Sequence, residues 1–117
     1  MMVVIMIETP LGVANAKEIA AVPGIDVIFA ASGDLGNFSG HKQGDPEYEA
    51  LVTRIHDVTF SKGIKLGGPL NWINREGYSF FQGPGETQLI AAGAKLALAP
   101  NSSSGAPGKL GSADLVH

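Results

Sequence analysis

The chain has 117 residues, of which 44% are hydrophobic and 16% are charged, and its net charge is −3. This composition can bury a core, and the negative charge gives no electrostatic reason to expect nucleic acid or an anionic membrane as a partner. Because there is no cysteine, disulfides, thiolate metal sites and cysteine nucleophiles are excluded. The opening apolar run ends at Glu8 and lacks a basic leader, so we expect neither a signal peptide nor a membrane span, and a cytoplasmic location.

The first part of the chain shows a strand–helix–strand pattern. Residues 1–7 and 25–31 form continuous apolar runs, which are typical of buried parallel strands. Residues 14–22 between them predict a helix that ends before Pro23. The pattern therefore predicts a βαβ unit, whose ligand site is expected at the carboxyl ends of its strands.

An acid follows each of these two predicted strands, Glu8 after the first and Asp34 after the second. A carboxylate at the end of a buried strand loses hydration unless something pairs with it, and no basic residue closes either strand. A hard divalent cation would satisfy both acids, because Mg²⁺ is commonly held by one or two carboxylates. The structural alternative stays open here, since either acid alone is more typical of a helix N-cap or a turn.

The rest of the chain continues the alternation of strands and helices. A polar, glycine-rich loop is expected before the second helix, and a short helix is expected between the last two strands. The predicted segments are a loop over 36–45, a helix over 46–61, a strand over 64–70, a strand over 78–82 and a helix over 86–98.

These segments amount to about four βα units within one predicted domain, residues 1–99. The composition changes at Pro100, and we predict a flexible tail over residues 100–117. A complete (β/α)₈ barrel typically needs about 250 residues. The α/β pattern is thus long enough for half of such a barrel, with four parallel strands in sequential order and right-handed crossovers.

Several short motifs in this order and spacing resemble one family, the metal-dependent 2-keto acid aldolases of the HpcH/HpaI type. That family includes the 2-dehydro-3-deoxyglucarate and 4-hydroxy-2-oxoheptanedioate aldolases. The motifs are Ile7-Glu8-Thr9, Gly12-Val13-Ala14-Asn15, the segment 19–26 and Gly33-Asp34-Leu35.

The resemblance implies a fold and a set of site residues. The fold is the C-terminal half of a (β/α)₈ TIM barrel of the phosphoenolpyruvate/pyruvate type. Glu8 and Asp34 match the family residues that bind a divalent metal cation (Mg²⁺, Mn²⁺ or Co²⁺). Backbone amides of Ser32, Gly33 and Asp34 match the loop that holds the substrate carboxylate, and Leu70 matches a position that borders the substrate.

The resemblance also implies an activity, which is carbon–carbon lyase chemistry. A 2-keto-3-deoxy or 4-hydroxy-2-oxo acid would be cleaved to pyruvate and an aldehyde. The family's catalytic His and Arg lie on the first four barrel strands, and no residue of this chain matches them, so the catalytic residues stay unassigned. The chain also has Met6 where family members often have Gln, two places before the metal Glu.

Three interpretations follow. The first is an aldolase polypeptide that acts on a small pyruvate-like 2-keto acid and lacks the catalytic half, so that it needs a complementing N-terminal half or a homo-oligomer. The second is a non-catalytic α/β remnant or subunit that binds metal or keto acid weakly, or only packs with a partner. The third is a CoA-ester lyase of the wider citrate-lyase-like superfamily, which the spacing of Glu8 and Asp34 fits less well.

Overall fold

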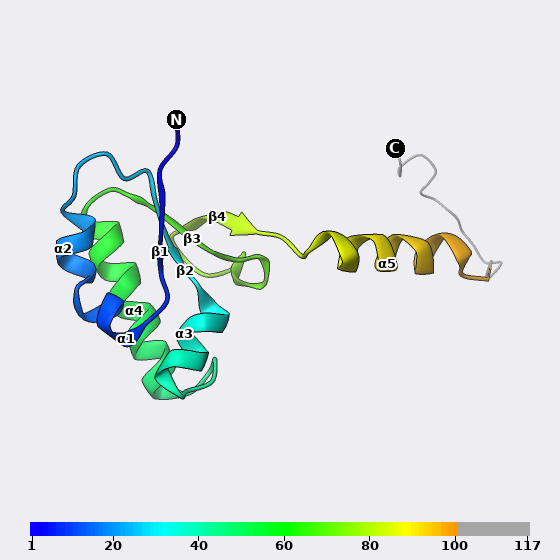
Figure 1. Cartoon of the computed structure of the whole chain (residues 1–117), viewed down its shortest axis with the longest axis horizontal. Coiled ribbons are helices and arrows are strands. Elements are labelled where there is room, and N and C mark those ends of the chain that lie inside the picture. The colour runs from blue at the N-terminus through cyan, green and yellow to red at the C-terminus, as the bar shows by residue number, and fades with distance from the viewer. Residues whose placement is uncertain (101–117) are drawn as a thin grey trace. The chain divides into compact units, whose positions relative to one another are not determined.

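The computed structural model describes residues 1–100, which fall into two compact units, one of Met1–Gly83 and one that begins at Pro84. The first unit contains a four-stranded parallel sheet in the order β1-β2-β3-β4 (Figure 1). Its strands are β1 (Val4–Ile7), β2 (Val27–Ala30), β3 (Lys65–Pro69) and β4 (Tyr78–Gln82).

Helices and a short 3₁₀ turn connect the strands, as expected for consecutive parallel strands. Figure 1 shows α1, α2 and α4 gathered on one side of the strands. The helical segments of this unit are α1 (Pro10–Ala14), α2 (Ala16–Ala20), α3 (Ser32–Ser39), α4 (Pro46–Ser61) and η1 (Leu70–Trp72).

The helix-covered face of the sheet carries the hydrophobic core. Ile28 of β2 pairs in register with Leu66 of β3, and both are almost fully buried. Because side chains alternate along a strand, alternate residues of neighbouring strands share this face. The core cluster joins these strand residues to the helices, and it comprises Ile7, Val13, Ala16, Ala20, Ile28, Ala30, Leu35, Tyr48, Val52, Ile55, Leu66 and Trp72.

On the opposite face of the sheet, one row of paired residues crosses all four strands. Met6 pairs with Phe29, Phe29 with Gly67, and Gly67 with Phe80. The rings of Phe29 and Phe80 meet edge to face, with centroids 6.4 Å apart. Gly67 leaves room for them, since a Cβ there would lie 2.7 Å from Phe29. Met6 remains 52% exposed, so this face is less completely covered than the helical one.

The helix predicted over residues 14–22 is wrong in its bounds, because α1 begins earlier, at Pro10, and α2 extends only from Ala16 to Ala20. The side chain of Thr9 accepts a hydrogen bond from the amide of Gly12 at 3.0 Å, and Pro10 occupies the first helical position. These are standard signals for a helix start. The chain turns at Asn15, which ends α1 and precedes α2.

The loop predicted over residues 36–45 is wrong in its first part, where α3 continues to Ser39. Two glycines and two serines lower the helix propensity of this segment, but Leu35 anchors it, with no exposed surface. Gly40 ends the helix with φ +76°, a left-handed conformation that glycine adopts readily.

The two long helices predicted later in the chain and the fourth strand are confirmed at their bounds. The helix over 46–61 is α4, the strand over 78–82 is β4, and the helix over 86–98 is α5 (Glu86–Leu98), which belongs to the second unit and buries none of its residues. The predicted tail lies outside the described residues except for Pro100, and the predicted boundary at residue 99 stays a prediction. Among residues 1–100, no helix has the length and apolar character that crossing a bilayer requires.

Candidate functional site

The two predicted metal ligands follow neighbouring strands at the same edge of the sheet. Ile7 of β1 pairs with Ala30 of β2, and the amide of Ala31 donates to the carbonyl of Ile7 at 3.0 Å. Glu8 comes directly after Ile7 and is half-buried, whereas Asp34 lies in the first turn of α3 and is exposed. Within residues 1–100, neither carboxylate takes part in a salt bridge, so both remain able to bind a cation.

The predicted carboxylate-binding residues Ser32, Gly33 and Asp34 are the first three residues of α3. The first amides of a helix have no acceptor within the helix, and the helix dipole makes this end favourable for an anion. The N-cap position is Ala31, whose side chain forms no capping hydrogen bond. The amides that the sequence predicts for substrate binding are therefore not occupied by a capping side chain.

A hollow of about 320 Å³ lies beside these residues. It brings Ser32, Gly33 and Asp34 together, but its lining includes neither Glu8 nor Leu70. Leu70 begins η1 just after β3 and is 45% exposed. The full lining is Met6, Phe29, Ala31, Ser32, Gly33, Asp34, Asn37 and Gln82.

Sequence reasoning missed two polar residues of this hollow, Asn37 and Gln82. Asn37 follows Asp34 by three residues in α3, so the two side chains lie on the same side of the helix. A loop, as predicted for residues 36–45, does not imply this relation between the two side chains. Gln82 is the last residue of β4 and pairs with Pro69, and its place at the carboxyl end of a predicted parallel strand was the signal that could have found it.

The side chain of Met6 lines the same hollow as Asp34. Side chains two residues apart share one face of a strand, so extending β1 by one residue places Glu8 on the side of Met6. At the position where family members often have Gln, the chain therefore presents a thioether that offers the hollow no strong hydrogen bond.

The donor set at this edge fits a hard divalent cation better than a soft one. Two carboxylates are oxygen donors, and Mg²⁺ typically completes its shell with waters and substrate oxygens rather than with further protein ligands. Among the described residues, no group of three or more His, Asp or Glu side chains is assembled for a metal. Glu8 and Asp34 therefore fit a cation whose remaining ligands are not protein side chains of residues 1–100.

Two basic residues near this end of the sheet, Arg75 and His41, lie close to acids of α4. Both terminal nitrogens of Arg75 donate to the carboxylate of Glu49, at 2.8 and 3.2 Å. This hydrogen bond is the largest cause that lowers the pKa of Glu49 and raises the pKa of Arg75. The imidazole of His41 lies 3.9 Å from the carboxylate of Glu47. Arg75 is thus held as a structural clamp in this unit.

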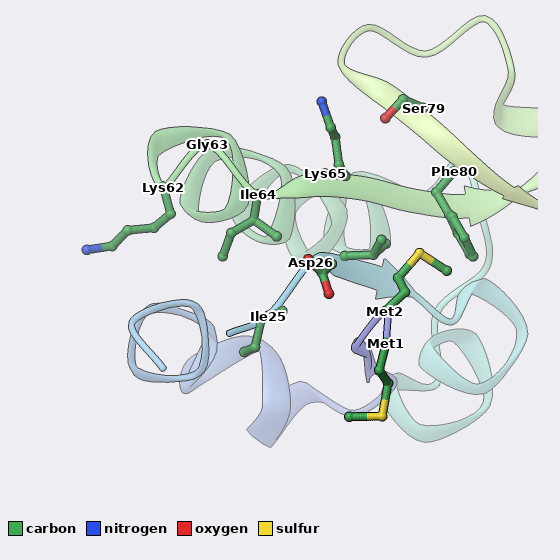
Figure 2. Close-up of a pocket in the computed structure, with 11 residues that line it drawn as sticks. Met1, Met2, Ile25, Asp26, Lys62, Gly63, Ile64, Lys65, Ser79 and Phe80 are labelled. Carbon is green, nitrogen blue, oxygen red and sulfur yellow. The ribbon is translucent and has the colours of Figure 1, made fainter. Parts of the chain in front are cut away.

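A larger hollow of about 800 Å³ lies at the opposite, amino-terminal edge of the sheet (Figure 2). Its acid, Asp26, accepts a hydrogen bond from the amide of Val3 at 2.7 Å, which is a structural role. In Figure 2 the side chains of Lys62 and Lys65 extend away from the ribbon. Ligand sites of parallel α/β sheets lie at the carboxyl edge instead, so the size of this hollow does not make it the functional site.

Comparison with known proteins identifies the class of the chain. Residues 1–66 match the family model for HpcH/HpaI aldolase/citrate lyase. The chain belongs to this family. The matched segment includes Glu8 and the Ser32–Asp34 turn, and the resemblance seen in the sequence is confirmed.

Two curated relatives have names that state an activity. The 2-dehydro-3,6-dideoxy-6-sulfogluconate aldolase of Pseudomonas putida is 34% identical over 85 residues, which cover 66% of this chain and 33% of that protein. The hydroxypyruvate/pyruvate aldolase of Chromohalobacter salexigens is 39% identical over 67 residues, covering 55% of this chain and 26% of that protein. The chain thus spans about a third or less of the length of these relatives.

Solved structures share the fold. An HpcH/HpaI aldolase/citrate lyase family protein from Burkholderia cenocepacia superposes with a TM-score of 0.72 at 24% identity, covering 83% of this chain and 41% of that one. The HpcH/HpaI aldolase from Desulfitobacterium hafniense gives a TM-score of 0.69 at 20% identity, covering 92% and 44%. The predicted fold, four parallel βα units from half of a TIM barrel, is confirmed.

Proposed function

We propose that this chain contributes the metal- and keto-acid-binding part of an aldol lyase. The reaction is divalent-metal-dependent cleavage of a 2-keto-3-deoxy or 4-hydroxy-2-oxo acid to pyruvate and an aldehyde. The observation that carries the proposal is the placement of Glu8 and Asp34 after adjacent parallel strands, β1 and β2, at one edge of the sheet. The aldolase names of the curated relatives support it.

Glu8 and Asp34 hold the cation in this proposal. A bound Mg²⁺, Mn²⁺ or Co²⁺ would supply Lewis-acid polarisation of the keto oxygen. The two acids follow separate strands that are tied in register by hydrogen bonds, Glu8 directly after β1 and Asp34 in the first turn of α3. Regular elements of the fold therefore carry the segments that hold both acids, which favours a preorganised site.

The first turn of α3 binds the substrate carboxylate. Amides of Ser32, Gly33 and Asp34 lack intrahelical acceptors and sit at the positive end of the helix. Preorganised amides stabilise an anion without the cost of reorienting solvent. The hollow of about 320 Å³ next to this turn suits a small keto acid, and Leu70 remains a predicted wall residue.

Proton transfer is assigned to residues outside the described unit. Arg75 is engaged with Glu49, and His41 has no family counterpart. The acid–base groups would come from a complementing N-terminal barrel half or from a second copy of the chain. Activity in this proposal belongs to the completed site, whereas cation and pyruvate binding belong to this chain.

Melting curves of the 117-residue chain test the proposal, with Mg²⁺, Mn²⁺ or Co²⁺ and with or without pyruvate. A ligand that binds only the folded state raises the midpoint, by about 2.7 kcal/mol of stability at one hundred times its Kd. We expect pyruvate to raise the midpoint only when metal is present. Glu8→Gln and Asp34→Asn should abolish this shift, and Glu18→Gln, an exposed acid on α2, should retain it.

Two results would contradict the proposal. One is a cooperative melt of the wild-type chain that shows no shift at millimolar metal and pyruvate. The other is a shift of equal size in Glu8→Gln, Asp34→Asn and the control, which would place binding elsewhere. Either result would favour a non-catalytic α/β subunit.

A further inference from the structure

The hydroxyl of Tyr48 contacts the proposed carboxylate-binding turn at a backbone carbonyl, not at the amides. Tyr48 lies in the first turn of α4 and is 1% exposed, and its Oη donates to the backbone carbonyl of Ser32 at 2.9 Å. Sixteen residues separate the two in the sequence. The bond therefore ties the start of α4 to the start of α3.

The direction of this bond matters for a ligand. In an α-helix the carbonyls point towards the C-terminus and the free amides of the first turn point the opposite way. A donor on the Ser32 carbonyl therefore holds the turn without competing for its amides. Ala31 provides no side-chain cap, so the bond from Tyr48 is a restraint on this turn that comes from another helix.

The ring of Tyr48 also packs against α3. A Cβ on Gly36 would lie 3.8 Å from Cε2 of Tyr48 and 3.2 Å from the carbonyl oxygen of His41. A distance of 3.8 Å is ordinary van der Waals contact, so the ring lies alongside the helix at Gly36. The contact is thus made by both the ring and the hydroxyl, and a Phe at this position would keep only the first.

A clamp next to Tyr48 holds the start of α4 in place. Glu49 accepts from the amide of Gly44 at 3.0 Å and from Arg75 at 2.8 Å. The guanidinium of Arg75 lies 4.2 Å from the centroid of the Trp72 ring, at the distance of a cation–π contact. The indole of Trp72 in turn donates to the side chain of Gln43. Tyr48 therefore projects from a segment that is fixed on both sides.

We propose that Tyr48 is a positioning residue for the keto-acid site: its hydroxyl fixes the first turn of α3 so that the amides of Gly33 and Asp34 face the substrate carboxylate. This inference rests on the proposed function. It assigns Tyr48 no contact with substrate or metal. Its effect is expected on the affinity for pyruvate, through the order of two backbone amides.

The chain offers a matched control in its other tyrosine. Tyr78 is also largely buried, and among the described residues its hydroxyl has no hydrogen-bond partner. Tyr48→Phe and Tyr78→Phe each remove one buried hydroxyl and keep the ring. Only the first removes a bond to the turn, so a general effect of losing a tyrosine hydroxyl appears in both variants.

Two measurements on the full chain test the inference. With saturating Mg²⁺, titration calorimetry should show the pyruvate Kd raised about three- to tenfold in Tyr48→Phe, the range that one net hydrogen bond supplies. Tyr78→Phe should stay within about twofold of wild type, as expected when no hydrogen bond is lost. Without ligand, ¹⁵N relaxation should show lower order parameters for the Gly33 and Asp34 amides in Tyr48→Phe alone.

The outcomes separate the two proposals. Unchanged amide order parameters in Tyr48→Phe would overturn the positioning role, whatever the ligand does. An unchanged Kd beside a wild-type chain that binds pyruvate would overturn it as well and leave the proposed function intact. A wild-type chain that does not bind pyruvate with metal would overturn the proposed function, and the assignment of Tyr48 to a keto-acid site would fall with it.

Discussion

The two faces of the sheet differ in how completely they are covered. On the helical face, Ile55 of α4 and Ile28 of β2 have no exposed surface. On the other face, the edge-to-face pair of Phe29 and Phe80 lies next to Met6, which is half exposed. The helical face thus provides the stable support, whereas the hollow beside Asp34 opens on the side of Met6 and Phe29. In our proposal, stability and ligand binding depend on opposite faces of one four-stranded sheet.

The largest expected effect compares truncation on the two faces. Ile55→Ala should lower the free energy of unfolding by about 2–5 kcal/mol, because it removes a fully buried side chain and leaves a cavity. Met6→Ala should cost less than about 1 kcal/mol, because half of that side chain already contacts solvent. Urea unfolding of both variants, followed by circular dichroism, measures the difference. Equal losses would mean that both faces are equally packed, and the proposed difference between the two faces would be wrong.

The fold was predictable where local signals agreed with tertiary contacts. The helix that begins at Pro46 and ends before Lys62 was found at its bounds, because proline and the Lys62-Gly63 pair mark its two ends. α3 was missed because its stability comes from contacts that are distant in sequence, such as the bond from Tyr48 to Ser32. Propensity alone favours a loop over a segment with two glycines.

The same distinction between local signals and tertiary contacts applies to the residues of the candidate site. Glu8 and the Ser32–Asp34 turn could be placed from sequence, because each follows an apolar run that predicts a strand. Asn37 could not, since its proximity to Asp34 depends on the missed helix. Gln82 could have been included, because it ends a predicted parallel strand, and it lines the hollow together with Asp34.

A smaller effect compares two adjacent glycines of β3 that lie on opposite faces. A Cβ on Gly68 would lie 2.7 Å from the Trp72 ring, within the helical core, and one on Gly67 would lie 2.7 Å from the Phe29 ring on the other face. Overpacking typically costs about 1–3 kcal/mol. We expect Gly68→Ala to cost about 3 kcal/mol and Gly67→Ala about 1 kcal/mol. Trp72 lies inside the helical core, whereas the buried Phe29 has the half-buried Phe80 and the half-exposed Met6 as neighbours that can move towards solvent.

Thermal and urea unfolding of the two glycine variants check this ranking. Both substitutions add one methyl group at neighbouring positions of one strand, so each serves as the control for the other. A larger loss for Gly67→Ala than for Gly68→Ala would show that the Phe29 and Phe80 rings are held as rigidly as Trp72. The distinction between a closed and an open face would then be wrong.

The smallest effect concerns the pair of Glu49 and Arg75, which joins α4 to the segment after η1 on the helical side. The hydrogen bond from Arg75 lowers the pKa of Glu49 from its ordinary value of 4.5. A carboxyl whose pKa is lowered by folding stabilises the folded state fully above its unfolded pKa, and the contribution is lost as the pH falls through the folded pKa. Stability due to this pair should therefore be present at neutral pH and lost below about pH 4.

Glu49→Gln should remove this contribution and flatten the acid limb of the stability curve. Because both side chains are about one-third exposed, solvent screening limits the loss at pH 7 to about 1 kcal/mol or less. Glu18→Gln is the matched control, since Glu18 is an exposed acid that also lies in a first helical turn but has no salt-bridge partner among the described residues. Urea midpoints of the three proteins between about pH 3 and 7, across the range where carboxyls titrate, should converge at the acid end. If the wild type and Glu49→Gln lost stability in parallel over this range, the acid sensitivity would come from groups other than the pair of Glu49 and Arg75.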